Sequence, residues 1–403
     1  MLFAIAWRNI IRNWRRSLLT VMGAALGLAA LLFLWGFNDG SHNRMMRNIQ
    51  ESIVGSIQVH KDGFFKKPRL KDYLDEPERI AKLMLENGAP NATLRLRTFA
   101  LLAGDNTSQG AMLLGIDPVR EGEVTVLPSK ITQGRFFRPD EGFSCIIGAT
   151  AAKNLEVKLG DSIVVLTQDR YDSLSADRCE LVGIIESGEM GVDRGMAMVP
   201  IGPLQQMLSM QGKANEVVTL VGEDQIEDIT ASLKSSLGKG IEVLRWYDMY
   251  PVMKEWVRLD NAFYYIFLSI VLLIVSAGIL NTVLMSMLER THEFGVMMGL
   301  GAKRMQIASM VFIESMLLGV AGVVAGLVLG LSLVTYFGEV GIDLSAEMDT
   351  AQRFYIDPVI YAEIDLDHLL ITVVAVLLSN VAAAMYPAFR ASKLEPVEAI
   401  HHV

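Results

Sequence analysis

The feature that most constrains this chain is a set of four long apolar runs. They cover residues 17–37, 261–288, 307–337 and 368–389, and Glu314 is the only Asp, Glu, Lys or Arg within them. An apolar run of about 18 or more residues is long enough, as a helix, to cross a hydrocarbon layer about 30 Å thick. The sequence therefore predicts four transmembrane helices.

The short segments outside these runs differ in charge. Residues 1–16 contain four arginines and no acid, and the link 289–306 and the tail after 389 also carry Lys and Arg. The link 338–367 instead has eight acids and one arginine. Lys and Arg in short loops stay on the cytoplasmic side. Both termini and the 289–306 link are therefore predicted inside, and 38–260 and 338–367 outside.

A long segment of mixed character separates the first and second runs. In residues 38–260, alternating apolar residues typical of strands are interspersed with helical periods. The strands are predicted at 56–60, 93–102, 111–116, 144–147, 162–167 and 180–185, and the helices at 76–86, 203–210 and 225–237. The predicted fold class is therefore a membrane protein: four transmembrane α-helices with a large extracytoplasmic α+β domain, of one or two subdomains, between the first and second.

These patterns divide the chain into three parts. Residues 1–37 hold an amphipathic segment and the first transmembrane helix, 38–260 form the extracytoplasmic domain, and 261–403 hold the other three helices. The aromatic residues of the amphipathic segment recur at helical spacing, which is typical of a helix in the membrane interface; the alternative is a simple extension of the first span. The first run is longer than the apolar core of a signal peptide, so we expect an uncleaved anchor.

The sequence lacks the short motifs of several enzyme classes. It has no G-x-x-x-x-G-K-[ST] phosphate loop, no H-E-x-x-H, no G-x-S-x-G and no Cys/His cluster at metal spacing. The adjacent imidazoles of His401 and His402 stand alone at the tail. We therefore expect no catalytic residue, no metal site and no cofactor in this chain, and no nucleic acid among its partners.

Two cysteines, Cys145 and Cys179, lie in the predicted extracytoplasmic domain. An oxidising compartment allows a disulfide between them. Alternatively, each is a small buried residue of a strand. The sequence does not decide between the two.

Polar residues are rare in the four runs, which argues against a water-filled pathway. Glu314 either has a structural role, for example by pairing with Arg304, or moves during coupling. The amides of Asn281 and Asn380 are expected to form interhelical hydrogen bonds. Glycines four residues apart predict close helix packing; they are Gly23, Gly27, Gly322, Gly326 and Gly330.

The link 289–306 reads ERTHEFGVMMGLGAKRMQ. It is charged at both ends and carries an apolar, methionine-rich centre made by Phe294, Val296, Met297 and Met298. A short inside helix with an adaptable apolar face is suited to docking on a cytoplasmic partner. The alternative is a plain amphipathic connector.

Three segments together resemble a known family. AWRNIIRNWRRSLLTVMGAALG at the start, ERTHEFGVMMGLGAKRMQI in the link and YPAFRASKLEPVEAI at the end are similar to the FtsX-like permeases of ABC transporters, of the macrolide-exporter and lipoprotein-releasing types. In the large domain, GATAAKNLEVKLGDSIVVL also resembles its counterpart in that family. Phe294 stands where the family usually has Ile.

The resemblance implies a transport subunit rather than an enzyme. Such permeases lie in the bacterial inner membrane among its lipids and act as dimers, with a second copy or a paralogue. Two cytoplasmic ATPase subunits bind the ATP and Mg and drive the outer domain by mechanotransmission through the membrane helices. The coupling helix of the family corresponds to 289–306. The coupling residues implied here are Glu289, Arg290, Glu293, Phe294, Gly295 and Met298.

The size of the chain and its single outer domain most resemble the lipoprotein-releasing permeases. This implies a lipoprotein or another lipidated or amphipathic substrate, taken from the outer leaflet. In these permeases the first and second spans form a groove for acyl chains, and the residues suited to it here are Phe33, Trp35, Phe37, Phe263, Tyr264 and Phe267. The same residues would also suit an interfacial aromatic belt.

Other functions within and outside this family stay open. Segment 168–178 lies where one lipoprotein-releasing permease has a hairpin that recruits a periplasmic carrier, and it is shorter here, which leaves recruitment of a carrier or adaptor open. One alternative function is efflux of small molecules or peptides with an outer-membrane partner. Another is regulation of a cell-wall hydrolase by the outer domain.

Overall fold

The computed structural model describes residues 2–188, 190–344 and 359–393. His401, His402 and residues 345–358 of the acidic link lie outside this range. The described chain separates into two compact units. One holds the residues up to 43 together with those after 255, and the other holds the residues between 44 and 255. We describe each unit by itself.

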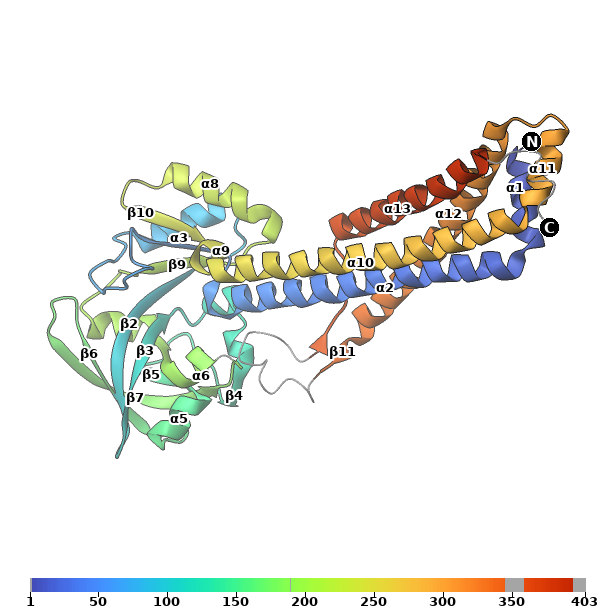
Figure 1. Cartoon of the computed structure of the whole chain (residues 1–403). Helices are drawn as coiled ribbons and strands as arrows, with labels where there is room; N and C mark the ends of the chain where they lie inside the picture. Colours follow the sequence, from blue (N-terminus) through green and yellow to red (C-terminus); the bar gives the residue numbers. More distant parts are fainter. Residues whose placement is uncertain (1, 189, 345–358, 394–403) are drawn as a thin grey trace. The chain divides into compact units, whose positions relative to one another are not determined.

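The first unit consists almost wholly of helices (Figure 1). They are α1 (Leu2–Arg12), α2 (Trp14–Ile49), α10 (Pro251–Glu289), α11 (Thr291–Gly299), α12 (Arg304–Val340) and α13 (Leu366–Ser392), with a short strand pair β11 (Ile342–Asp343) and β12 (Val359–Ile360) between the last two. In the described chain, α2, α10, α12 and α13 are long and apolar enough to cross a membrane. The four predicted apolar helices are thus confirmed, each longer than its apolar run.

Glycines bring α12 close to α2. A Cβ added at Gly326 would lie 2.8 Å from Leu28 Cβ, and one at Gly322 would lie 2.6 Å from Ala24 Cβ. Gly330 meets Leu32 in the same way. The predicted close packing is confirmed for these glycines and for Gly27, which faces α10. It is wrong for Gly23, since a Cβ added there would meet no other described part of the chain within 4 Å.

α1 is a helix separate from α2, because the chain is not α-helical at Asn13. Phe3, Trp7 and Ile11 are exposed and repeat every four residues along one face. Such an apolar stripe at the end of a membrane bundle suits the interfacial position expected from the sequence. Asn9 of the same helix is buried.

The second unit contains a single ten-stranded sheet with helices packed on it. Its strands are β1 (Ile57–Lys61), β2 (Thr93–Ala103), β3 (Ser108–Ile116), β4 (Ile131–Gly134), β5 (Ser144–Gly148), β6 (Ser162–Gln168), β7 (Leu174–Ile185), β8 (Met196–Pro200), β9 (Glu216–Thr219) and β10 (Ile241–Arg245). Its helices are α3 (Pro77–Glu86), α4 (Glu121–Val124), α5 (Ala149–Leu155), α6 (Met190–Gly195), α7 (Ile201–Met207), α8 (Ile226–Ser236) and α9 (Trp246–Met249).

Six of these strands close into a ring. The pairing runs β2–β3–β8–β5–β7–β6 and returns to β2. Alternate residues point into the ring and form one core, in which Leu113, Ile147 and Val165 are fully buried. The first residues of β2 instead pair with β9, and β9 continues through β1 to β10. The long strand β2 therefore joins two halves of the sheet.

Cys145 and Cys179 lie inside the closed ring, on β5 and β7. Both are buried and both are free thiols. Of the two alternatives open from the sequence, the structure shows the small buried strand residue and not the disulfide. The neighbouring thiol and burial both hold the pKa of Cys145 well above its usual value.

Candidate functional site

α11 is the short helix that the sequence places between two apolar runs. It follows Arg290, and its C-cap is Leu300. Gly301 then has φ +100°, a left-handed conformation that glycine adopts without strain. Lys303 begins the next helix with its backbone N–H donating to Gln306 Oε1 at 2.8 Å. The predicted short helix in the 289–306 link is therefore present.

The apolar side of α11 faces its own bundle. Phe294 is fully buried, and Gly295 and Met298 are buried as well. The side chains of Phe294 and Met298 pack in a core with residues of α10, α12 and α13. The prediction that Phe294 and Met298 form a docking face is therefore wrong. The physical reason is that α11 packs back against the ends of the long helices, and its apolar stripe covers them.

The opposite side of α11 is exposed. Glu293 and Val296 lie on it, followed by Leu300, whose exposed fraction is 84%. Met305, at the start of α12, is also exposed. An apolar side chain in this position beside a charged rim resembles the centre of a protein interface. We call Glu293, Val296 and Leu300 the outward face of α11.

Two arginines from the start of the chain hold the carboxylates around α11. Arg16 Nη2 donates to Glu289 Oε1 at 2.7 Å. Arg12 Nη2 donates to Glu293 Oε1 at 2.9 Å and to Oε2 at 3.1 Å. These ion pairs join the N-terminal helices to the end of α10 and to α11, across more than 270 residues of sequence.

Arg290 links α11 to the third long helix. Its Nε donates to Glu293 Oε2 at 2.9 Å and its Nη1 donates to Glu314 Oε2 at 3.0 Å. The guanidinium also lies 5.3 Å from the ring centre of Phe294. The suggested pairing of Glu314 with Arg304 is therefore replaced by a largely buried pair with Arg290.

The charge of Glu293 is stabilised by these contacts. Burial on its own would raise the pKa of this carboxyl, but the hydrogen bond from Arg290 and the charges of Arg290 and Arg12 outweigh it, and the pKa lies below its usual value. Glu293 is thus ionised near neutral pH and acts as the acceptor for two arginines.

Neither of the two intramembrane amides is placed as expected in the described chain. Asn281 is exposed on α10. Asn380 on α13 is buried against α12, where a Cβ at Gly319 would fall 1.3 Å from its Nδ2. Within the described chain neither atom of the Asn380 amide has a hydrogen-bond partner. The predicted interhelical hydrogen bond at Asn380 is therefore wrong for the described residues, and Asn281 does not face a helix of its own bundle.

The six aromatic residues predicted for a groove separate into different environments. Phe33 packs on Phe337 of α12, with ring centres 5.3 Å apart. Trp35 is buried, with its ring 5.4 Å from that of Tyr264. Phe263 and Phe267 are both 58% exposed on α10. The half-buried Phe37 completes the set. Within the described chain they form no single groove, because α12 and α13 cover the first-span residues.

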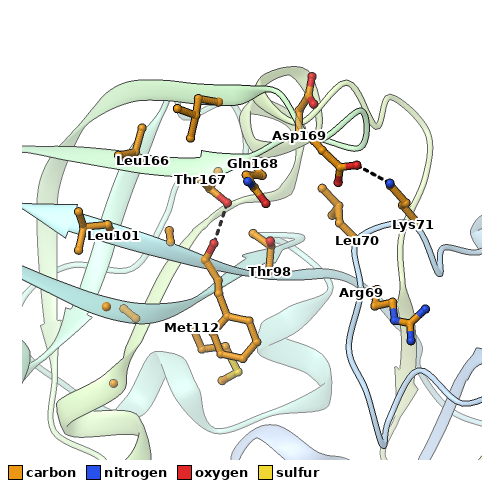
Figure 2. A pocket seen from close by; sticks show the side chains of 17 residues that line it. Arg69, Leu70, Lys71, Thr98, Leu101, Met112, Leu166, Thr167, Gln168 and Asp169 are labelled. Atoms are coloured by element: carbon orange, nitrogen blue, oxygen red, sulfur yellow. Dashed lines mark hydrogen bonds and ion pairs between the residues drawn. The ribbon is translucent and has the colours of Figure 1, made fainter.

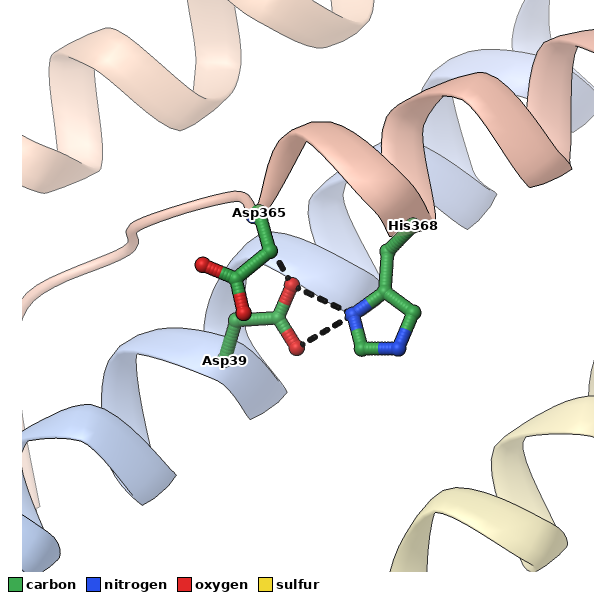
Figure 3. A group of neighbouring side chains, drawn as sticks. All are labelled: Asp39, Asp365 and His368. Atoms are coloured by element: carbon green, nitrogen blue, oxygen red, sulfur yellow. Dashed lines mark hydrogen bonds and ion pairs between the residues drawn. The ribbon is translucent and has the colours of Figure 1, made fainter. Parts of the chain in front are cut away.

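A polar cluster lies at the same end of the bundle as Trp35 (Figure 3). His368 stacks on the Trp35 ring, with centres 3.9 Å apart and planes 15° apart. Its Nδ1 is 2.8 Å from Asp39 Oδ1, and the backbone N–H of Asp365 donates to Asp39 Oδ2 at 3.1 Å. His42 lies further along α2, with its Nε2 3.1 Å from Asp260 Oδ2. The sequence analysis missed this cluster.

The α+β unit has an open cavity of about 860 Å³ on the closed ring (Figure 2). Strands β2, β3 and β6 line it, and Phe99 and Leu101 on β2 are exposed there. Thr167 Oγ1 donates to the Phe99 carbonyl at 2.7 Å across the strands. At its rim Lys71 forms an ion pair with Asp172, in the turn of the β6–β7 hairpin. The cavity therefore combines an apolar floor with a charged edge.

Two family models match the chain. The FtsX-like permease C-terminal model matches residues 265–396, and the MacB-like periplasmic core domain model matches residues 17–236. The chain belongs to the FtsX-like permeases of ABC transporters. The first match contains α11 and Glu314, and the second contains most of the α+β unit.

The permease is similar in sequence to named relatives. It is 23% identical to the lipoprotein-releasing system transmembrane protein LolC of Xylella fastidiosa, over 96% of this chain and 94% of that protein. It is 24% identical to the macrolide export ATP-binding/permease protein MacB of Hyphomonas neptunium, over 98% of this chain and 60% of that protein. The periplasmic region of MacB from Actinobacillus actinomycetemcomitans aligns with 52% of this chain, at 15% identity and a TM-score of 0.38, covering 97% of that structure.

Sequence reasoning found the carboxylates of this permease's site but missed their partners. Glu289 and Glu293 were predicted from the link, whereas Arg12 and Arg16 were interpreted only as orientation signals. The signal available was the four arginines without an acid in residues 1–16, together with the two acids at the start of the link, Glu289 and Glu293. Which arginine meets which acid depends on how α1 packs, and no local pattern reveals it.

Proposed function

We propose that this permease is the membrane subunit of a transporter whose ATPase is a separate cytoplasmic chain, present in two copies that bind the ATP and Mg. The observation that carries the proposal is the construction of α11. One side is anchored in the bundle by Phe294 and Met298, while the other exposes Leu300 to a partner. A push on the outward face of α11 would therefore be passed to the long helices. The proposal places both termini and α11 in the cytoplasm and the α+β unit outside.

The ion pairs are the parts that transmit this motion. Through Arg290, α11 is tied to Glu314 of α12, and through Arg12 it is tied to α1. A buried pair resists separation, because removing one partner leaves a charge without compensation. In this account Glu314 has a positioning role: it keeps α12 fixed to α11 as the ATPase closes.

A second permease copy or a paralogue is proposed to cover α10. Only 11% of the apolar window of this helix is buried within the chain, against 39% for α12. Asn281 lies exposed on it. An amide facing hydrocarbon is unfavourable, and a neighbouring helix can offer it a hydrogen-bond partner. Lipids would cover the remaining surface.

The substrate proposed is a lipoprotein or another lipidated or amphipathic molecule. The similarity to LolC along nearly its whole length supports this choice, as do the exposed Phe263 and Phe267, which acyl chains could contact. Efflux of small molecules or peptides with an outer-membrane partner is the second candidate, and the similarity to MacB favours it. A periplasmic carrier or adaptor, if recruited, would have the cavity and hairpin of Figure 2 as its nearest candidate surface.

The test is to purify the permease together with its ATPase and identify what accompanies it. A lipoprotein or lipid identified by mass spectrometry, and lost in a Phe263→Asp/Phe267→Asp variant that still holds the ATPase, is the expected result. A complex that carries no lipidated molecule, and whose ATP hydrolysis responds instead to a small drug or peptide, would contradict the substrate and favour efflux.

A further inference from the structure

Two carboxylates and one imidazole converge between α2 and the start of α13 (Figure 3). A carboxylate oxygen from Asp39, another from Asp365 and a ring nitrogen of His368 all lie within 4.8 Å of one another. Asp39 lies in the last third of α2, whereas Asp365 is the N-cap of α13 and His368 lies in its first turn. The three residues belong to the same compact unit.

The charge of this group is unbalanced. Asp39 is 3% exposed, and the carboxyl of Asp365 lies beside it. A single imidazolium can compensate only one of two carboxylates, whereas a divalent cation compensates both. Like charges held this close are stable only when a cation or a proton lies between them.

The group is also held in place. His368 is fixed by its stacking on the buried Trp35, and Asp39 is oriented by the backbone N–H of Asp365. Ligands whose positions are set by packing and by further hydrogen bonds lose little freedom when an ion binds. Asp365 is exposed, so one side of the group is open to solvent.

We propose that Asp39, Asp365 and His368 bind a divalent transition-metal ion, with Zn²⁺ as the reference ion. An imidazole with two carboxylates suits Zn²⁺ and its neighbours, whereas Mg²⁺ and Ca²⁺ prefer oxygen ligands alone. The ion takes the place of the hydrogen on His368 Nδ1, and the ring keeps a hydrogen on Nε2. Water would complete the coordination on the side of Asp365.

The geometry needs an adjustment, because the three ligand atoms are spread within 4.8 Å of one another. Ligands at about 2.0–2.1 Å from tetrahedral Zn²⁺ lie about 3.4 Å from one another. The present separation of 2.8 Å between His368 Nδ1 and Asp39 Oδ1 would therefore open by about half an ångström. A bound ion would join α2 to α13 at the end of the bundle remote from α11, since Asp39 is 23 residues, or about 35 Å of helix, from Arg16.

The test is metal binding by the full chain, purified in detergent without a histidine tag and stripped with a chelator. A His401→Ala/His402→Ala background removes the tail imidazoles. Zn²⁺ is titrated by calorimetry, Co²⁺ is followed by its visible absorption, and the melting temperature is recorded with and without Zn²⁺. We expect one ion per chain and a higher melting temperature when Zn²⁺ is present.

The variants decide where the ion binds. Asp365→Asn and His368→Gln should each weaken Zn²⁺ binding at least about tenfold and abolish the Co²⁺ absorption. Asp367→Asn, an exposed acid on the same turn, is the matched control and should bind within about twofold of the background chain. Because Asp365 is exposed, its variant should fold even if His368→Gln does not. No stoichiometric binding by the background chain, or binding unchanged in Asp365→Asn, would overturn the proposal.

Discussion

Arg290 Nη1 donates to Glu314 Oε2 at 3.0 Å, and both side chains are largely shielded from solvent. This ion pair compensates the charge of Glu314, the one charged residue within the apolar runs. It forms a fixed joint between α11 and α12. Whether an intramembrane acid is structural or mobile therefore depends on its partner, and Arg290 was predicted only as a coupling residue.

Breaking this joint should destabilise the permease strongly. Arg290→Ala leaves the Glu314 carboxylate buried without its partner, which costs about 3–5 kcal/mol of unfolding free energy. The exposed pair of Arg12 and Glu293 should contribute under about 1 kcal/mol, so Arg12→Ala is the control. The measurement is thermal unfolding of both variants in detergent. Equal melting temperatures for the two variants would show that the buried pair is not a joint.

Close packing of α12 on α2 gives a second prediction. Gly326→Ala places a Cβ 2.8 Å from Leu28 Cβ and should destabilise the bundle by about 1–3 kcal/mol. Gly23→Ala adds the same methyl group where nothing lies within 4 Å, and the gain in helix propensity should leave it neutral or slightly more stable. If both variants melt alike in detergent, the glycine contact does not contribute to stability.

His60 in the α+β unit predicts an acid sensitivity. Burial and the charge of Arg97 lower the pKa of His60 to about 4, although the charge of Glu216 acts in the opposite direction. His60 Nδ1 lies 3.8 Å from Glu242 Oε1, which is too far for a hydrogen bond. The unfolded chain, with a histidine pKa of about 6.5, binds the proton more readily than the folded chain. Stability is therefore complete above about pH 6.5 and falls as the pH drops toward 4, by roughly 3 kcal/mol at most.

The check is unfolding of the wild type and of His60→Leu at pH 7.5 and pH 4.5. Leucine cannot be protonated, so the variant should lose less stability on acidification than the wild type does. The opposite result, an equal loss in both proteins, would assign the acid sensitivity to other groups.

Orientation in the membrane can be tested with single cysteines. The native Cys145 and Cys179 are buried and should not react with a membrane-impermeant thiol reagent. Cysteine at the exposed Asp105 should be labelled in cells with a permeabilised outer membrane and an intact inner membrane. Cysteine at Leu300 should be labelled only after lysis. Labelling at position 300 before lysis would reverse the proposed orientation.

Much of the fold could be predicted because its signals are local. Four apolar runs and several alternating strands are visible without tertiary contacts, and β2, β5 and β6 begin at the predicted residues. The short strands β4, β8, β9 and β10 were missed, because runs of four or five residues often show too little periodicity to identify a strand, although β1 and β5 of five residues were found. Closure of the ring by the β2–β6 pairing is a tertiary contact that no local pattern encodes.

The site was only partly predictable, for a different physical reason. The position of α11 could be found, but the direction of its apolar face could not, because Phe294 and Met298 suit a partner's groove and the protein's own core equally well. The cluster of Asp39 and His368 joins residues more than 300 positions apart. Metal motifs are recognised by short spacings, so the expectation of no metal site followed from the absence of such a spacing.

The central claim is that the outward face of α11 receives the ATPase. Leu300→Asp should weaken that contact by about 2 kcal/mol or more, because a charge would enter an apolar interface centre. Glu293→Lys should also weaken the contact with the ATPase, because it places a third positive charge next to Arg12 and Arg290. Lys303→Ala, in the exit turn, is the control and should behave as the wild type.

The most direct measurement is co-purification of the ATPase with each variant, together with ATP hydrolysis stimulated by the permease. The account predicts that Leu300→Asp loses the ATPase or its stimulation while its melting temperature in detergent stays close to that of the wild type, that Glu293→Lys also loses the ATPase or its stimulation, and that Lys303→Ala keeps both. Normal assembly and normal stimulation in Leu300→Asp and Glu293→Lys would contradict it, and α11 would then be only a connector between α10 and α12.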